Sequence, residues 1–177
     1  MADGYSLLLA EFAARVDGMK QALAGHGFVL CGNEPLKLTI STKPYGYTGD
    51  EFARLLREQH IMCEFHDPDF VVMMLTPGNT EEDLPRLEQA LLTIPQKDAI
   101  LREPPEFHRC ERAMSIREAA MSPCETIPVS KCAGRVLAAP SVGCPPAVPI
   151  VICGERIDKT AADRFAYYGT ETCTVVL

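Results

Sequence analysis

The side chains best suited to chemistry lie close together, between residues 60 and 69. Glu64 ends a short stretch, 61–64, in which it alternates with apolar neighbours, as residues do along a half-buried strand. The pattern predicts a buried strand over 61–64, with the Glu64 carboxylate at its end. Glu64 is therefore the best candidate for a functional residue. The alternative is an ordinary edge glutamate in solvent.

A histidine and two carboxylates follow at once: His66, Asp67 and Asp69. Such a group could suggest a metal site, but Pro68 stands in its middle and the composition is that of a turn. Asp side chains in this setting hydrogen-bond the backbone just after them, as in an Asx turn. We therefore expect a turn between two strands, 61–64 and 70–75, and no metal site.

A proline-rich arm runs from Cys144 to Glu155, with the sequence CPPAVPIVICGE. Prolines fix φ and remove backbone donors, so the arm is predicted to be extended, close to polyproline II. The apolar, β-branched run 148–152 predicts a buried strand that Gly154 closes. A simple proline-stiffened loop is the alternative. No His or Lys adjoins Cys144 to lower its pKa, so we expect an inert thiol.

The region from residue 134 to residue 155 resembles the C-terminal signature of the bacterial ornithine/lysine/arginine decarboxylases, which are pyridoxal-phosphate enzymes of the aminotransferase-like fold. The matching residues are Gly134, Arg135, Pro145, Pro146, Pro149, Gly154 and Glu155. The departures are Cys144 for the usual Tyr, Ala147 for the usual Gly and Cys153 for the usual Pro. Ala147 matters most, because a glycine there suggests a close backbone approach or positive φ. The resemblance implies a structural or interface role for the matching residues.

The same resemblance implies that the catalytic lysine lies outside this chain. The family's Schiff-base lysine follows a histidine, and none of the six lysines here does. The family's Asp-x-Ala-His segment, whose Asp pairs with the pyridine nitrogen, is also absent. We therefore expect no catalytic, cofactor-binding or metal-binding residue in this chain, with pyridoxal phosphate held by the parent enzyme.

The resemblance gives Glu64 a substrate-binding role. In the family, a glutamate on the strand that 61–64 matches lies near the active site and faces the distal amine of the substrate. His60 stands where the family usually has Gly.

Hydrophobic spacing predicts the elements that position these residues. A helix is expected over 5–24, and the capping-box spacing from Thr48 to Glu51 opens a second one, which runs to about residue 59. A third begins near Thr80, with Pro85 kinking it or delaying its start. Strands are expected at 28–31, 36–42, 61–64 and 70–75. The resulting order, α-β-β-α-β-β-α, resembles the small subdomain of aminotransferase-fold enzymes.

The remaining residues predict a second domain. A second capping-box spacing, from Ser115 to Glu118, opens a short helix, and one helical turn over 129–133 ends at Gly134. Asp158 caps a further helix. The β-branched end, 172–177, is expected to be a strand that pairs with the strand around Ile150 or with the sheet edge.

The predicted fold class is therefore α+β. Helices pack on a small mixed sheet in residues 1–96, the aminotransferase-like small subdomain. A linker over 97–114 leads to an α+β C-terminal domain over 115–177.

Composition excludes several classes of function. A net charge of −7 and a pI near 5.1, without a basic cluster, argue against nucleic-acid binding. No apolar run is long enough for a membrane span, and no signal peptide is visible. None of the eight cysteines falls in a C-x-x-C pair, so we expect buried, reduced thiols in a cytoplasmic protein.

The leading hypothesis is the C-terminal part of a pyridoxal-phosphate-dependent decarboxylase of arginine, lysine or ornithine. It would close one side of the active site, support a homodimer or higher oligomer, and be inactive without the large cofactor-binding domain. An exposed apolar face is expected where that domain docks. The alternative is a stand-alone binding or oligomerisation module that partners a separate catalytic chain.

Overall fold

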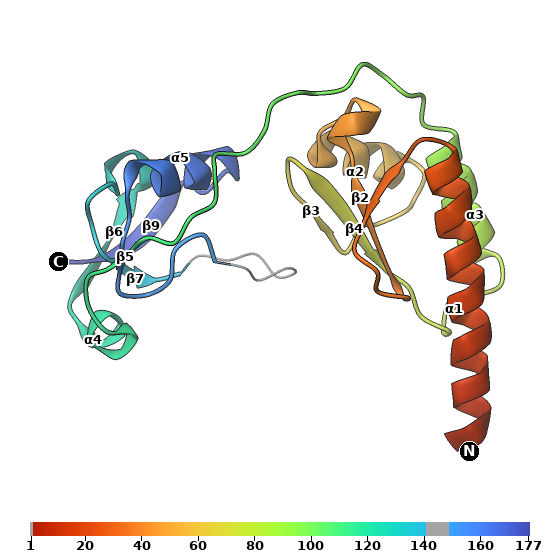
Figure 1. The fold of residues 1–177 in the computed structure, drawn as a ribbon, viewed down its shortest axis with the longest axis horizontal. Helices are drawn as coiled ribbons and strands as arrows, with labels where there is room; N and C mark the ends of the chain where they lie inside the picture. The colour runs from red at the N-terminus through yellow and green to blue at the C-terminus, as the bar shows by residue number, and fades with distance from the viewer. Residues whose placement is uncertain (1, 141–148) are drawn as a thin grey trace. The chain divides into compact units, whose positions relative to one another are not determined.

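The computed structural model describes residues 2–140 and 149–177. The chain divides into two compact units, Met1–Leu101 and Arg102–Leu177 (Figure 1). The division falls inside the segment 97–114 that the sequence predicts as a linker. No helix in the described residues is both long and apolar enough to cross a membrane.

The first unit has the predicted order of elements, α-β-β-α-β-β-α. The elements are α1 (Ala2–Gly25), β1 (Val29–Cys31), β2 (Lys37–Ser41), α2 (Gly49–Glu58), β3 (Phe65–His66), β4 (Phe70–Met74) and α3 (Asp83–Leu92), with a 3-10 turn, η1, at Lys43–Tyr45. The strands form one sheet in the order β1-β2-β4-β3. This arrangement confirms the α+β class.

The sheet is antiparallel throughout, so the prediction of a mixed sheet is wrong. The crossover through α2 leaves β2 and β3 pointing the same way, which would suit a parallel pair. However, β4 turns back from β3 and inserts between the two strands, so it pairs antiparallel with both.

All three helices of the first unit contribute to one core, which covers one face of the sheet. Leu38 and Ile40 of β2 lie opposite Met73 and Val71 of β4, and all four are buried. The helices add side chains at helical spacing, among them Phe12, Val16, Leu23, Phe52, Leu56, Leu87 and Leu91. Burying each large apolar side chain contributes roughly 1.5–3 kcal/mol.

The helix starts follow the sequence signals. At α2, the Thr48 hydroxyl accepts a hydrogen bond from the Glu51 N–H at 3.2 Å, and Glu51 accepts one from the Thr48 N–H at 3.0 Å. This confirms the capping box. Helix α3 begins at Asp83, three residues after Thr80, and so keeps Pro85 within the first turn, where a missing N–H costs little. The delayed start is therefore confirmed.

The second unit holds two small antiparallel sheets. Its elements are β5 (Glu111–Arg112), α4 (Ile116–Met121), β6 (Cys124–Pro128), η2 (Val129–Lys131), β7 (Leu137–Ala139), β8 (Glu155–Arg156), α5 (Lys159–Tyr167) and β9 (Thr172–Val176). Strand β5 pairs with β8, and the other three strands lie in the order β6-β9-β7. The Ser115–Glu118 capping box and the Asp158 cap are confirmed.

The terminal strand predicted over 172–177 is confirmed as β9, but the strand predicted around Ile150 and the pairing predicted for the terminal strand are wrong. Residues 150–152 form no strand, and the pairing occurs later, at β8. The terminal strand β9 does not pair there but lies between β6 and β7, neither of which the sequence predicted. Val151 is nevertheless buried in the unit's core, so the apolar run marks burial and not strand pairing.

Candidate functional site

Glu64 lies just before β3, and its backbone is fixed to the sheet edge. Its N–H donates to the carbonyl of Val72 in β4 at 2.9 Å. Residue-by-residue pairing with β4 begins only at Phe65, so the predicted strand over 61–64 is wrong. The side chain of Glu64 is exposed.

The way α2 ends explains the missing strand. His60 has a positive φ of 60°, and the N–H of Ile61 turns back to the carbonyl of Leu56 at 2.9 Å. The chain is therefore still leaving the helix at a point where the alternating pattern suggests an extended strand. Ile61 packs partly buried against the core, which accounts for the apolar signal in this stretch.

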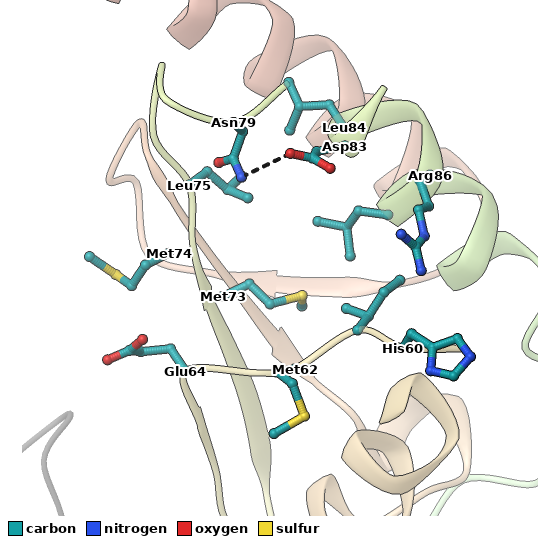
Figure 2. Close-up of a pocket in the computed structure, with 12 residues that line it drawn as sticks. His60, Met62, Glu64, Met73, Met74, Leu75, Asn79, Asp83, Leu84 and Arg86 are labelled. Atoms are coloured by element: carbon teal, nitrogen blue, oxygen red, sulfur yellow. Dashed lines mark hydrogen bonds between the residues drawn. The ribbon is translucent and has the colours of Figure 1, made fainter. Parts of the chain in front are cut away.

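A pocket of about 260 Å³ lies beside Glu64, between the end of β4 and the start of α3 (Figure 2). Its apolar lining includes three methionines, Met62, Met73 and Met74. Met62 and Met74 are 70% and 57% exposed. Because methionine is flexible and polarisable, such a lining adapts to ligands of different shape.

Two of the polar groups in the pocket belong to the turn that starts α3. Asp83 accepts hydrogen bonds from the Thr80 N–H at 2.8 Å and from the amide of Asn79 at 3.4 Å. The first of these bonds is the main cause that lowers the pKa of Asp83. Asn79 in turn accepts from the N–H of Thr76 at 3.0 Å. These groups thus hold the pocket wall in place.

Two ionisable side chains of the pocket lining, Glu64 and His60, have no partner among the described residues, and Glu64 is the one that carries a negative charge. Arg86, which also lines the pocket, donates to the carbonyl of Gln59 at 3.2 Å. Within the described residues, the Glu64 side chain accepts no hydrogen bond and forms no ion pair. A carboxylate beside a methionine-rich pocket can bind a cationic group with an aliphatic stem, because charge and stem then each meet a suitable surface.

The pocket does not fit covalent attachment of pyridoxal phosphate. That chemistry needs a lysine amine, and no lysine is among the described residues that line the pocket. Lys43 is buried, in an ion pair with Asp69 at 2.5 Å.

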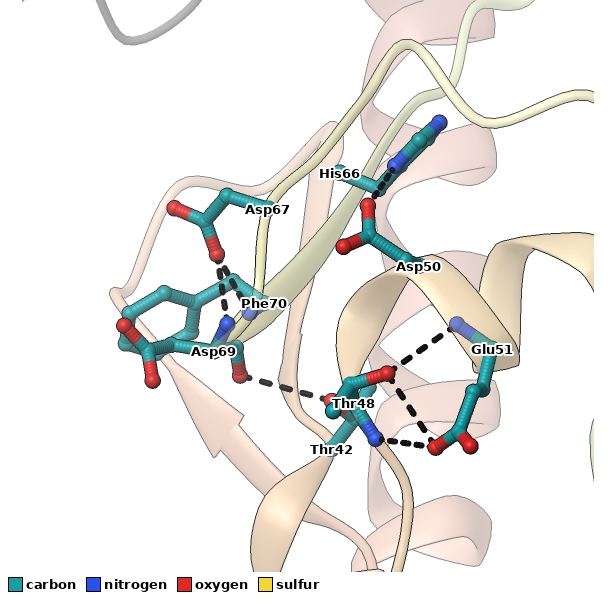
Figure 3. A network of polar contacts seen from close by, with 8 residues as sticks. All are labelled: Thr42, Thr48, Asp50, Glu51, His66, Asp67, Asp69 and Phe70. Atoms are coloured by element: carbon teal, nitrogen blue, oxygen red, sulfur yellow. Dashed lines mark hydrogen bonds and ion pairs between the residues drawn. The ribbon is translucent and has the colours of Figure 1, made fainter. Parts of the chain in front are cut away.

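The cluster at 66–69 forms the predicted turn (Figure 3). One oxygen of Asp67 accepts from the N–H groups of Asp69 and Phe70, both at 2.8 Å, which confirms the Asx turn. His66 contacts Asp50 of α2 at 2.8 Å, and Asp69 pairs with Lys43. The three side chains are thus directed to three separate partners.

The described part of the family-like motif brings two distant segments side by side. Gly134 donates its N–H to the Ile157 carbonyl at 2.7 Å, and Ile157 returns one to the Arg135 carbonyl at 2.8 Å. The Arg135 guanidinium contacts Glu125 and the Val176 carbonyl, both at 2.8 Å. The segments at 134–135 and 157, about twenty residues apart in the sequence, are therefore hydrogen-bonded to each other in the fold.

Gly154 occupies the tightest point of this structure. Its φ is +85°, and a Cβ there would lie 2.5 Å from the carbonyl oxygen of Met114. Its N–H donates to Leu137 at 2.8 Å, and its carbonyl accepts from Ala113 and Met114. Only glycine fits both the conformation and the space.

Glu155 is 6% exposed and accepts from the N–H of Ile152 at 3.1 Å. Pro149 is half-buried. The predictions for Cys144, Pro145, Pro146 and Ala147 lie outside the described residues.

The seven described cysteines are free thiols. The expectation of buried thiols is correct for Cys110, Cys132, Cys153 and Cys173, but Cys31 and Cys63 are half-buried and Cys124 is exposed. Burial raises the pKa of Cys63 to about 11 and that of Cys132 to about 12, so both stay protonated at neutral pH.

One further cluster was missed in the sequence: His108, Cys110 and Asp158 of the second unit. His108 and Cys110 are two residues apart and lie in the segment interpreted as a linker, whereas Asp158 comes about fifty residues later. The available signal was the His-x-Cys spacing, because residues i and i+2 of an extended chain point to the same side.

Comparison with known proteins places this α+β chain in a defined class. The family model described as "Orn/Lys/Arg decarboxylase, C-terminal domain" matches residues 96–171. The chain is 34% identical over 138 residues to the arginine decarboxylase of Bacillus subtilis, covering 71% of this chain and 27% of that protein. It is 31% identical over 180 residues to the arginine decarboxylase of Halalkalibacterium halodurans, covering 89% of this chain and 35% of that protein.

A solved structure has the same fold as this chain. The crystal structure of the Francisella novicida lysine decarboxylase matches with a TM-score of 0.68 at 13% identity, over 98% of this chain and 40% of that one. The chain therefore belongs to the Orn/Lys/Arg decarboxylase family and represents its C-terminal region. It spans about a quarter to a third of the length of the curated relatives it matches.

Proposed function

We propose that this chain is the C-terminal part of a pyridoxal-phosphate-dependent decarboxylase of a basic amino acid, in which it closes one side of the active site. In this proposal Glu64 binds the distal cation of arginine, lysine or ornithine. The observation that supports it is the exposed carboxylate of Glu64, without a partner among the described residues, beside a methionine-rich pocket. Such a protein acts in the cytoplasm, in polyamine metabolism.

The catalytic lysine and the cofactor site belong to a large domain outside this sequence. An apolar surface supports the idea that such a domain docks here. Tyr5, Leu7 and Leu8 in the first turns of α1 are 59%, 63% and 48% exposed. Contiguous exposed apolar side chains of this kind mark interaction surfaces. We also propose that the parent enzyme is a homodimer or higher oligomer.

The experiment that tests this proposal uses the isolated chain. We expect that adding pyridoxal phosphate, reducing with borohydride and measuring the intact mass will show no stoichiometric adduct. We also expect no release of CO₂ from arginine, lysine or ornithine. An adduct on a single lysine together with turnover would contradict the proposal, because the chain would then be a complete enzyme.

The alternative is a binding or oligomerisation module that partners a separate catalytic chain. The exposed residues of α1 are compatible with it. Co-expression with the large domain of a related decarboxylase distinguishes the two: activity restored in trans favours the module, whereas activity restored only by covalent fusion favours the C-terminal part.

A further inference from the structure

The second unit contains three side chains of different chemistry that converge at the start of α5. The imidazole Nε2 of His108 contacts Oδ2 of Asp158, and the thiol of Cys110 lies 3.9 Å from the same oxygen. One potential ligand atom from each residue lies within 4.8 Å of the other two. An imidazole, a thiol and a carboxylate in this arrangement are the donors that zinc binds in proteins.

We propose that His108, Cys110 and Asp158 bind a zinc ion that ties the segment before β5 to the start of α5. The donor set selects the metal. Thiolate and imidazole favour zinc over magnesium or calcium, which prefer shells made of oxygen ligands. A thiolate and a carboxylate also balance the two positive charges of Zn²⁺.

The ligands are held independently of any ion. Asp158 uses Oδ1 to cap α5, accepting from the Ala161 N–H at 2.8 Å, and so presents Oδ2 to the cluster. On the other side, Arg164 of α5 donates to the carbonyl of Pro105 at 2.5 Å. Its guanidinium also lies 5.1 Å from the centre of the Phe107 ring. The segment that carries His108 is therefore already anchored to the helix.

Only a small adjustment is needed for coordination. Ligand atoms of a tetrahedral zinc site lie roughly 3.5 Å apart, given zinc–ligand distances of about 2.0–2.3 Å. The His108 side chain is 39% exposed and can rotate, whereas Cys110 is buried and fixed. With three protein ligands, the fourth position faces solvent and takes a water molecule, because Asp158 is also partly exposed at 46%.

Zinc binding to the complete 177-residue chain, prepared without a histidine tag and in reducing buffer, tests the proposal. We expect one Zn²⁺ per chain by mass spectrometry after equilibration with a zinc buffer. Replacing zinc by Co²⁺ should give the absorption of a thiolate-bound cobalt ion. His108→Ala and Cys110→Ser should each weaken zinc binding by at least roughly tenfold to a hundredfold, the loss typical of changes just outside a metal's ligand shell.

Matched variants separate ligand loss from unfolding. Asp158→Asn preserves the helix cap, since Asn and Asp cap equally well, but removes the anionic ligand. It should therefore weaken zinc binding while the circular dichroism stays unchanged. Cys31→Ser and His60→Ala, which change a thiol and an imidazole in the other unit, should keep full binding. The absence of stoichiometric zinc in the wild-type chain, or full binding by Cys110→Ser, would show a hydrogen-bonded cluster only and overturn the proposal.

Discussion

Two backbone N–H groups fix the position of the Asp67 carboxylate, but its surroundings disfavour its negative charge. Burial is the main cause that raises its pKa, and the nearby carboxylates of Asp69 and Asp50 add to the effect, although the two backbone bonds oppose it. A raised pKa means that the Asp67 carboxyl holds its proton more tightly in the folded state than in the unfolded state. The stability from this group is therefore complete below its ordinary pKa of 3.8 and is lost as the pH rises through the raised value.

Asp67→Asn should consequently be neutral or stabilising at pH 7. An amide oxygen can still accept both backbone bonds, and no charge has to be buried. Asp67→Ala should destabilise by about 1–2 kcal/mol, because both N–H groups lose their acceptor. Urea unfolding at pH 3.5 and pH 7 measures these differences. The advantage of Asp67→Asn over wild type should grow with pH, and an advantage that shrinks would contradict the assignment.

At the level of elements, short-range sequence patterns predicted where helices start, but the sequence did not predict which strands pair. The capping boxes at Thr48 and Ser115 predicted two helix starts, because their hydrogen bonds join residues three apart. Strands β6 and β7 gave no comparable signal, since each pairs with β9, which is at least 33 residues further along the chain. The apolar runs at 61–64 and 150–152 each contain residues that pack on a core, such as Ile61 and Val151, but neither run pairs as a strand. Met62 and Ile152 are exposed, so burial was predicted only in part.

The candidate site shows the same division. Glu64 was predicted from its alternation and from a family resemblance. The residues of α3 that complete the pocket, such as Asp83 and Arg86, could not be found, because only the folded sheet brings them beside it. His108 and Asp158 are likewise far apart in the sequence, and only the folded chain brings them together.

The glycines of the family-like motif provide an internal comparison at this scale. Gly134 and Gly154 have similar φ values, +87° and +85°. A Cβ at Gly134 would meet nothing within 4 Å, whereas one at Gly154 would collide with the backbone of Met114. Gly134→Ala should cost about 1–2 kcal/mol, the strain of the left-handed conformation alone. Gly154→Ala should cost clearly more.

Thermal unfolding of the two variants, followed by circular dichroism, measures the difference. The larger loss at Gly154 would show that this glycine is required for the close approach of the backbone at residue 154 to the segment before α4. Equal losses would mean that backbone conformation alone explains both positions.

For the whole molecule, the chain matches the C-terminal region of much longer relatives. The chain belongs to the Orn/Lys/Arg decarboxylase family, and it covers 27% and 35% of two arginine decarboxylases. The described residues offer a carboxylate at a pocket but no lysine in that pocket. We therefore propose that this chain contributes to substrate binding and depends on a cofactor-bearing domain.

A chimeric enzyme tests this assignment most directly. In it, this chain replaces the matching C-terminal region of the Bacillus subtilis arginine decarboxylase, and steady-state kinetics are measured for arginine, lysine and ornithine. Glu64→Gln should raise KM for the preferred substrate by roughly tenfold or more, as expected for loss of a charge-assisted hydrogen bond of about 1.5–3 kcal/mol. Cofactor absorbance should stay unchanged. The control Glu58→Gln, which alters an exposed carboxylate of α2, should have little effect. An active chimera whose kinetics are the same with and without the Glu64 carboxylate would contradict the account.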